Sequence, residues 1–202
     1  MKAYPTCLLI LAMIASSVAK GEGIAELIGK AEAGEAAAQL ELGGLYLKGE
    51  GVTKDVAAAV KWLSQAAMLG NGEAQMKLGT LYISGKGVLK SSPEAAKWFM
   101  MSAEQGNAAA QCQIGRMHLT GAGVPKDDVE AYKWADLAAF QGDAAAKKII
   151  VFLLVRMTAA QVAEGKELSR DFLEMKKAEK SLDLPSDAPE PPLEPLPLLV
   201  PE

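Results

Sequence analysis

The chain has 202 residues, of which 50% are apolar and 23% are charged, a balance typical of a folded protein with a substantial core. Its 21 basic and 25 acidic residues give a formal charge of −4 at pH 7, and the basic residues are scattered along the sequence. A nucleic-acid-binding protein would be expected to gather its basic residues in a patch, so we expect no nucleic-acid partner.

The first predicted element is a secretory signal peptide at residues 1–19. Lys2 precedes an apolar run from Cys7 to Ile14, and small residues end at Ala19, the pattern of a cleavable signal. The run is far shorter than the ~20 residues that span a bilayer, and no later run is a better candidate. We therefore expect cleavage after Ala19 and a periplasmic or secreted protein that does not span the membrane. Because Cys7 leaves with the signal, Cys112 has no partner for an internal disulfide.

Three units of 36 residues follow in the centre of the chain, at 35–70, 71–106 and 107–142. The positions that recur at this spacing include three tryptophans, Trp62, Trp98 and Trp134. A fixed period of this length is typical of solenoids, whose units bury their apolar faces against their neighbours. Each unit has two stretches with apolar residues at helical spacing, so we predict two helices per unit, with the tryptophans buried between neighbouring helices.

A Gly-x-Gly-Val loop separates the two predicted helices of each unit, first as GEGVTKD at 49–55 and again at 85–91 and 121–127. Gly-rich loops can bind a phosphate through their backbone N–H groups. This loop lacks the third glycine and the preceding strand that a dinucleotide fingerprint requires. We therefore predict a structural turn: the first glycine ends a helix in the left-handed conformation, the second relaxes the turn, and the valine returns to the core.

The first unit contains the pattern Leu42-Gly43-x-x-Tyr46, Gly49-x-Gly51-Val52, Ala59-x-Lys61-Trp62 and Ala66-Ala67-x-x-Gly70. This pattern resembles the Sel-like repeat (SLR), a longer relative of the tetratricopeptide repeat (TPR), and the resemblance covers residues 35–142. The third unit departs from it, with Ile114 and His118 in place of Leu and Tyr. The resemblance implies an all-α, right-handed α-solenoid of helix-turn-helix repeats. It also implies that a concave surface, lined by the first helix of each unit, binds a protein or peptide.

Capping helices are predicted on both sides of the repeats. Residues 20–34 align with the second half of a unit in which Glu26 replaces the Trp, as expected of an N-terminal cap with a polar outer face. C-terminal capping helices are predicted at 143–180, where Thr158 and Gln161 form a capping box. An inward apolar stripe follows the box, at Val162, Leu168, Phe172 and Met175. The acidic, Pro-rich segment 181–202 is predicted to be a disordered tail, with a docking motif as the alternative.

Residues suited to catalysis or metal binding are few. His118 is the only histidine and occupies a tyrosine position of the repeat, which favours a packed aromatic substitute over a base or ligand. Cys112 aligns with Leu40 and Met76, which favours a packed thiol over an exposed reactive or dimer-forming one. No carboxylate pair stands in an apolar setting that would split its pKa values. We expect no catalytic site, no metal site, no cofactor and no enzymatic activity.

If the tetratricopeptide register holds, certain first-helix positions line the concave surface, and they vary among the units while the packing positions repeat. The candidate partner-binding residues are Leu40, Gly44, Glu73, Met76, Thr80, Cys112 and Arg116. Several are apolar where an idle surface would more often be polar, which favours an amphipathic helix or an extended apolar segment as the ligand.

The function predicted from these features is that of an exported, monomeric scaffold or adaptor that binds a partner protein, in envelope signalling or assembly. A similar C-terminal segment closes many bacterial SLR proteins, and this resemblance favours the bacterial periplasm. Two alternatives stay open. One is a secreted factor that binds a host protein or a glycan, and the other, less favoured, is a cell-envelope hydrolase.

Overall fold

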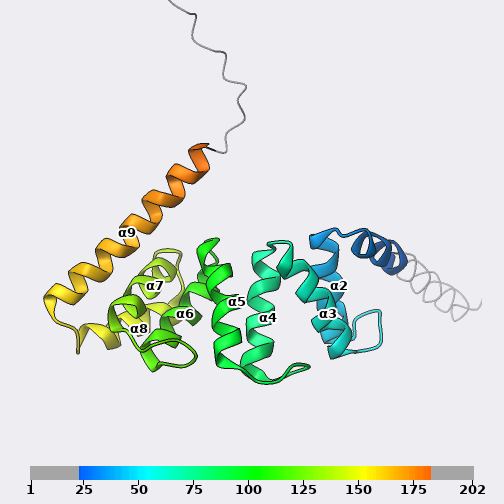
Figure 1. Ribbon diagram of the computed structural model, residues 1–202, viewed down its shortest axis with the longest axis horizontal. Helices are drawn as coiled ribbons and strands as arrows, with labels where there is room; N and C mark the ends of the chain where they lie inside the picture. The colour runs from blue at the N-terminus through cyan, green and yellow to red at the C-terminus, as the bar shows by residue number, and fades with distance from the viewer. Residues whose placement is uncertain (1–22, 183–202) are drawn as a thin grey trace, which may run out of the picture. The chain divides into compact units, whose positions relative to one another are not determined.

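The computed structural model describes residues 23–182, and every regular element within them is a helix. The predicted signal peptide and the predicted tail from residue 183 onward lie outside this range. A helical stretch at 23–32, called the N-terminal segment below, comes first. It is followed in chain order (Figure 1) by α2 (Ala36–Lys48), α3 (Val56–Met68), α4 (Gly72–Ser84), α5 (Ser92–Glu104), α6 (Ala108–Thr120), α7 (Asp128–Phe140), α8 (Ala144–Leu154) and α9 (Ala159–Leu182).

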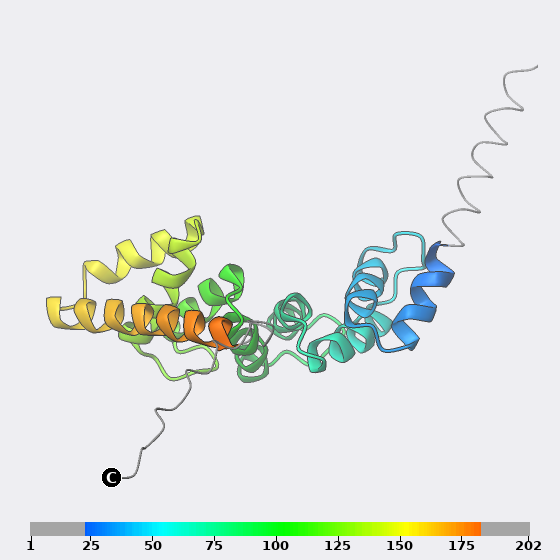
Figure 2. The ribbon, with the colours of Figure 1, turned by 90° about the horizontal axis from the view of Figure 1, so that it is seen from above.

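The chain divides into two compact units, Met1–Ser169 and Arg170–Glu202, and α2 to α8 all belong to the first. Within it each repeat contributes a pair of packed helices, α2 with α3, α4 with α5 and α6 with α7. Each second helix also packs against the first helix of the next repeat, α3 against α4 and α5 against α6. In the same way α7 packs against α8, which takes the place of the first helix of a fourth repeat. Figures 1 and 2 show the helices following one another in this order. The predicted all-α solenoid of helix pairs is confirmed.

Polar side chains begin most of these helices and satisfy backbone donors that have no partner inside the helix. Asp55, for example, accepts hydrogen bonds from the N–H groups of Ala57 and Ala58 at the start of α3. The other side chains that cap in this way are Asn71, Ser91, Asn107, Asp127 and Asp143. Glu35, at the corresponding place before α2, makes no such bond. The first repeat therefore begins with a weaker cap than the others.

The Gly-x-Gly loops have the backbone conformation predicted for them. Their first glycines end α2, α4 and α6 in the left-handed region, at φ values of 78°, 71° and 75°. The second glycines also have positive φ, and they make contacts that were not predicted. A Cβ atom at Gly87 would lie 2.6 Å from Cγ1 of Val56, and one at Gly123 would lie 2.4 Å from the carbonyl oxygen of Ser92. Each of these loops therefore lies against the first turn of the preceding second helix.

A second set of glycines lets the two helices of each repeat approach closely. A Cβ atom at Gly79 would lie 2.6 Å from the ring of Phe99, and one at Gly115 would lie 3.1 Å from the carbonyl oxygen of Ala131. In α8 the same repeat position is Val151, which is 65% exposed. A standard second helix could not approach a valine as closely as a glycine, so the regular pairing of helices ends at α8.

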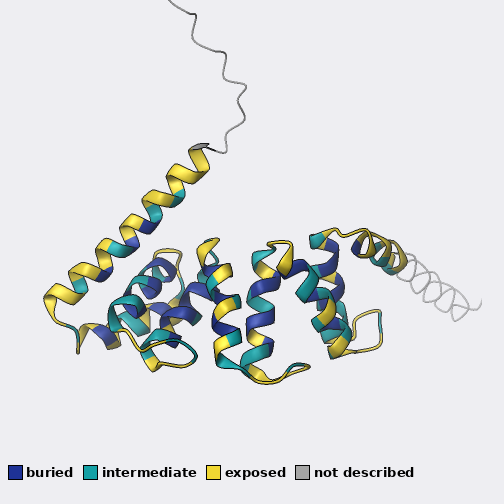
Figure 3. Ribbon diagram, viewed as in Figure 1, coloured by how far each residue is buried: buried dark blue, intermediate teal, exposed yellow. Residues whose placement is uncertain are grey.

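The three tryptophans differ in burial, although the repeat predicts the same environment for each. Trp134 is buried, as predicted, and its indole N–H donates to Glu130 at 3.0 Å. Trp62 and Trp98 are only half-buried, and Trp98 packs on the edge of the cluster formed by Leu63 and its neighbours. The fully buried aromatic residue of the second repeat is the neighbouring Phe99, with 2% exposure. Figure 3 shows buried positions in every helix from α2 to α7, whereas the loops are largely exposed.

The start of α9 closes the first compact unit. Thr158 and Gln161 form the predicted capping box, because Gln161 N–H donates to Thr158 Oγ1 at 3.3 Å and Thr158 N–H donates to Gln161 Oε1 at 2.9 Å. Val162 packs on the core, and Ser169 donates a hydrogen bond to Asp136 of α7 at 2.6 Å. Beyond this unit, Met175 is 49% exposed, so the predicted inward stripe does not extend to its last member.

An ion pair holds the first turn of α7, where no further Gly-x-Gly loop follows. Arg156, just after α8, lies 3.0 Å from the Oδ2 atom of Asp128.

Among residues 23–182, no helix combines the length and the apolar character needed to cross a membrane.

Candidate protein-binding site

A buried glutamine recurs near the start of each first helix and ties it to the helix before it. The side-chain N–H groups of Gln39, Gln75 and Gln111 donate to backbone carbonyl oxygens at 3.0, 3.1 and 3.1 Å. The acceptors, Ala31, Ala67 and Ala103, lie eight residues earlier in each case. Because these bonds fix which way each carboxamide faces, the three Oε1 atoms occupy equivalent places.

In the second and third repeats, another glutamine side chain of the same repeat donates a hydrogen bond to this oxygen. Gln105 Nε2 donates to Gln75 Oε1 at 2.9 Å, and Gln141 Nε2 donates to Gln111 Oε1 at 2.8 Å. In the first repeat the corresponding residue is Leu69, whose side chain has no donor. Gln39 is only 4% exposed, and its Oε1 atom has no hydrogen-bond partner among the described residues. A buried acceptor left in this state costs about 1–3 kcal/mol.

An open pocket of about 560 Å³, between the end of the N-terminal segment and α3, has Gln39 in its lining. We call it the first-unit pocket. A second amide oxygen in its lining, Gln65 Oε1, is also buried without a hydrogen-bond partner in the described part of the chain. The remaining wall is mostly apolar, formed by the half-buried Trp62 and by Met68 and Leu69, both of which are exposed. The pocket wall therefore contains two buried acceptor oxygens without partners beneath exposed apolar side chains.

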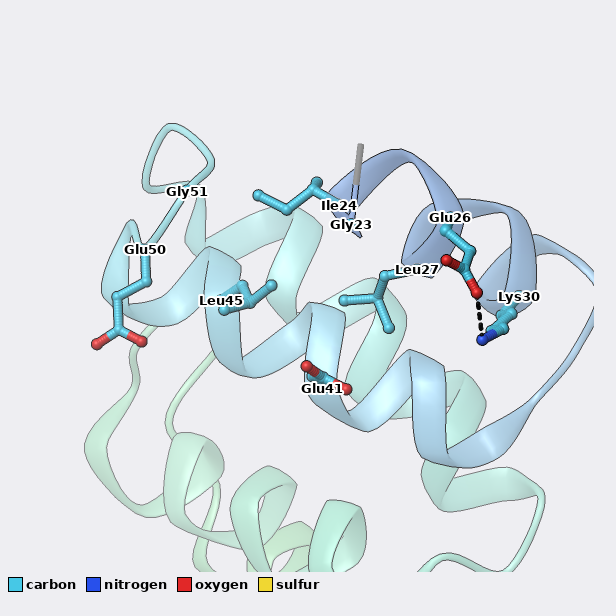
Figure 4. Close-up of a pocket in the computed structure, with 9 residues that line it drawn as sticks. All are labelled: Gly23, Ile24, Glu26, Leu27, Lys30, Glu41, Leu45, Glu50 and Gly51. Carbon is cyan, nitrogen blue, oxygen red and sulfur yellow. Dashed lines mark ion pairs between the residues drawn. The ribbon is translucent and has the colours of Figure 1, made fainter. Parts of the chain in front are cut away.

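A second pocket, of about 600 Å³, lies between the N-terminal segment and α2. Figure 4 shows Ile24, Leu27 and Leu45 gathered at its centre. At the rim Lys30 lies 2.7 Å from Glu26, and the hydrogen bond from the ammonium lowers the pKa of that carboxyl below its ordinary value. Gly23, the first described residue, forms part of the wall, so this pocket lies at the N-terminal end of the described helices.

The seven residues predicted to bind a partner differ in how far they reach the surface. Glu73, Thr80 and Arg116 are exposed, whereas Leu40, Gly44 and Met76 are half-buried and Cys112 is buried. The exposed members form bonds only within their own helices: Glu73 pairs with Lys77 at 3.0 Å, Thr80 donates to the carbonyl of Met76, and Arg116 donates to Gln113. They are therefore available to a partner without breaking contacts between helices.

Cys112 is 8% exposed and packs with Ala135, Ala138 and Ala146, so the favoured packed thiol agrees with the structure. Burial raises the pKa of the Cys112 thiol to about 11, and the nearby carboxylate of Asp143 adds to the effect. A thiol with this pKa stays protonated at neutral pH and is a poor nucleophile.

His118 is half-buried, and its Nδ1–H donates to the carbonyl oxygen of Pro125 at 3.2 Å. This bond holds the imidazole against the third Gly-x-Gly loop. Within residues 23–182, no three His, Cys, Asp or Glu side chains are grouped as metal ligands would be.

A family model described as Sel1 repeat matches residues 36–71, 72–107 and 108–143, more than half of the chain. The chain belongs to the Sel1 repeat family. The Sel1 matches begin one residue after the units taken from the sequence, and both divisions fall in the turn between α3 and α4 and its equivalents. A comparison with curated proteins gives no match.

Two solved structures of Sel1 repeat proteins are similar to this chain. A Sel1 repeat protein from Oxalobacter formigenes is 37% identical, with a TM-score of 0.61, over 64% of this chain and 97% of that one. The second is c5321, described as a protective antigen present in uropathogenic Escherichia coli strains displaying an SLR fold. It is 33% identical, with a TM-score of 0.70, over 81% of this chain and 36% of that one, so this chain spans about a third of its length.

The first-unit pocket was not among the predicted binding residues. The sequence did contain a signal for this pocket. Positions 69, 105 and 141 are equivalent in the three repeats, and the first of them is a leucine where the other two are glutamines. The sequence alone does not show that this glutamine donates to the buried glutamine of its repeat, because that requires the fold to place Gln105 beside Gln75.

Proposed function

We propose that this Sel1 repeat protein is an exported scaffold that binds a partner protein along the exposed face of its first helices. Sel1 repeats mediate protein–protein interactions and are typically non-catalytic modules. The observation that carries the proposal is a contrast within these helices. Three buried positions, occupied by Ala38, Gln39 and Gly43 in the first repeat, hold the same residue in all three repeats, while the more exposed position after the glycine differs.

The contrast is clearest at two positions of the repeat. Gly43, Gly79 and Gly115 are identical because each meets its own second helix in the same way. The next residues in the chain are Gly44, Thr80 and Arg116, and they share neither size nor charge. A bound partner presents a different surface to each repeat, so variation is expected at contact positions and identity at packing positions.

Export is supported by the signal pattern at residues 1–19, and we place the protein in the periplasm, in envelope signalling or assembly. A second candidate function is that of a secreted factor that binds a host protein or a glycan. The observation that favours it is the similarity to c5321, which is described as a protective antigen. Fractionation of cells into periplasm and medium, followed by immunoblotting, separates the two: a mature chain beginning at Lys20 in the medium supports the secreted factor.

A photo-crosslinking amino acid placed at Thr80 tests the binding surface in living cells. We expect one specific adduct, identified by mass spectrometry, and no adduct from the same amino acid at Thr53, which is exposed before α3. The double substitution Thr80→Glu and Arg116→Glu should then weaken binding of the identified partner by at least ~10-fold. The matched control is Thr53→Glu with Lys97→Glu, which makes the same charge changes outside the first helices. Equal loss in both double variants would place the interface elsewhere.

A further inference from the structure

The first-unit pocket is the only place in repeats one to three, within the described residues, where the buried first-helix glutamine lacks its second hydrogen bond. The later repeats show which group fits there. In both of them the donor is the carboxamide nitrogen of a glutamine that comes from the end of the second helix. The chain thus provides its own template for the missing group.

The pocket favours a neutral donor over a charged one. Gln39 Oε1 and Gln65 Oε1 are uncharged, and Gln39 is almost fully buried, so an ammonium or guanidinium group would lose much of its hydration there. The charges that line the pocket, Lys61 and Glu32, have opposite signs. A carboxamide NH₂ group carries two hydrogens, one for each of the two oxygens that lack a partner.

The two ends of this sequence offer no carboxamide for the pocket. Residues 1–22 and 183–202 contain neither glutamine nor asparagine. Neither segment can therefore place a carboxamide in the pocket. The exposed Met68 and the half-buried Trp62 line the same pocket, so the carboxamide is expected to come with apolar neighbours that cover them.

We propose that the first-unit pocket binds a glutamine side chain of a partner protein, set between apolar residues of an extended segment. Gln39 Oε1 and Gln65 Oε1 accept the two carboxamide hydrogens, as Gln75 and Gln111 accept from their own repeats. Leu69 moves aside on binding, which its 59% exposure and its position just after α3 allow. The site lies apart from Thr80 and Arg116, and it rests on the proposed function only in taking a protein segment as ligand.

Two blocked tripeptides test the chemistry of the ligand against the mature protein, by NMR titration. The probe is acetyl-Leu-Gln-Leu-N-methylamide, and the control carries Met, which has a similar shape and no amide, in place of Gln. We expect saturable shifts of the Gln39 side-chain amide and the Trp62 indole signals. Binding of the Gln peptide should be at least ~10-fold tighter, as one to two added hydrogen bonds would give. Equal affinities for the two peptides would overturn the proposal.

A substitution that fills the pocket from within provides the second arm. Leu69→Gln supplies the carboxamide found in the later repeats, so it should compete with the Gln peptide and reduce its affinity at least ~10-fold. Leu89→Gln makes the same change at an exposed leucine outside the pocket and should leave the affinity unchanged. If neither peptide binds the original chain at up to about 10 mM, the pocket holds water only and the proposal is wrong.

The two proposals can fail separately. The Thr80→Glu and Arg116→Glu double variant should bind the Gln peptide as well as the original chain does. Loss of peptide binding in that variant would mean that the two surfaces are not independent.

Discussion

The middle of the array and its two ends carry the same 36-residue pattern but complete it to different degrees. In the second repeat Gln75 receives a hydrogen bond from Gln105, and Gly79 lies against Phe99. At the N-terminal end Leu69 takes the place of that glutamine, and at the other end Val151 takes the place of that glycine. The middle therefore pairs this glutamine and covers this glycine from within the chain. The N-terminal end leaves the oxygen of Gln39 without a donor among the described residues, and the other end leaves Val151 exposed.

The largest effect is expected from damage to the middle of the array. Phe99→Ala removes a fully buried ring that fills the space beside Gly79, so it should cost roughly 3–5 kcal/mol of the free energy of unfolding. Trp98→Ala should cost less, because that ring is only half-buried. Urea denaturation followed by circular dichroism measures both. A larger cost for Trp98→Ala would mean that the tryptophan is the main anchor after all.

Exchanging glycine and valine at one repeat position compares the packing of α6 in the third repeat with the packing of α8. Gly115→Val forces a side chain against the backbone of α7 and should cost about 1–3 kcal/mol or more. Val151→Gly removes an exposed side chain and should cost no more than about 1 kcal/mol through helix propensity. Thermal melts of the two variants, recorded side by side, give the difference. Equal costs would show that α8 is packed as tightly as α6.

The hydrogen-bond difference between the first and second repeats can be reversed. Leu69→Gln should stabilise the chain by about 1 kcal/mol, because the buried oxygen of Gln39 gains a donor. Gln105→Leu should cost about 1–3 kcal/mol by leaving Gln75 Oε1 unpaired. Denaturant midpoints measure both changes, and Leu89→Gln serves as a control with no expected effect. If Leu69→Gln is neutral, water already satisfies Gln39.

The smallest effect at neutral pH concerns Cys112, which packs between α6 and α8. The thiol pKa is about 11 in the folded chain against an ordinary value of 9.0. Its contribution to stability is therefore complete below about pH 9 and is lost as pH rises towards 11. The stability of the original chain should fall between these pH values more steeply than that of Cys112→Ala. Alkylation by iodoacetamide at pH 8 should likewise be slow until the chain is unfolded.

The sequence predicted the parts of the fold that repeat. The glycine spacing placed the left-handed turns at Gly49, Gly85 and Gly121, and the Thr158 and Gln161 pair placed the start of α9. These features are local, because a turn or a cap is decided by a few neighbouring residues and their backbone preferences. Because the same few residues recur in each repeat, the same turn recurs with them and can be predicted from the sequence.

The sequence did not reveal features that depend on a partner far along the chain. In the sequence alone, Gln105 is an ordinary polar residue at the end of a predicted helix, and only the fold brings it to Gln75, 30 residues away. The half-burial of Trp98 was missed for the same reason, since a residue type does not tell which neighbour covers its ring. Cys112 fell in the predicted binding set, but α8 packs over its position and leaves it below the surface.

The contact between each second loop glycine and the preceding helix makes the opening of one repeat depend on the next. The first turns of α3 and α5 are covered by Gly87 and Gly123, so their amide hydrogens should exchange with solvent only when the following loop opens. The first turn of α7 has instead the ion pair between Arg156 and Asp128. Salt weakens ion pairs and leaves steric contacts unchanged, so added salt should speed amide exchange at the start of α7 more than at the start of α5, whose cap is the neutral Ser91. Ionic strength would thus change how readily the start of α7 opens relative to the start of α5.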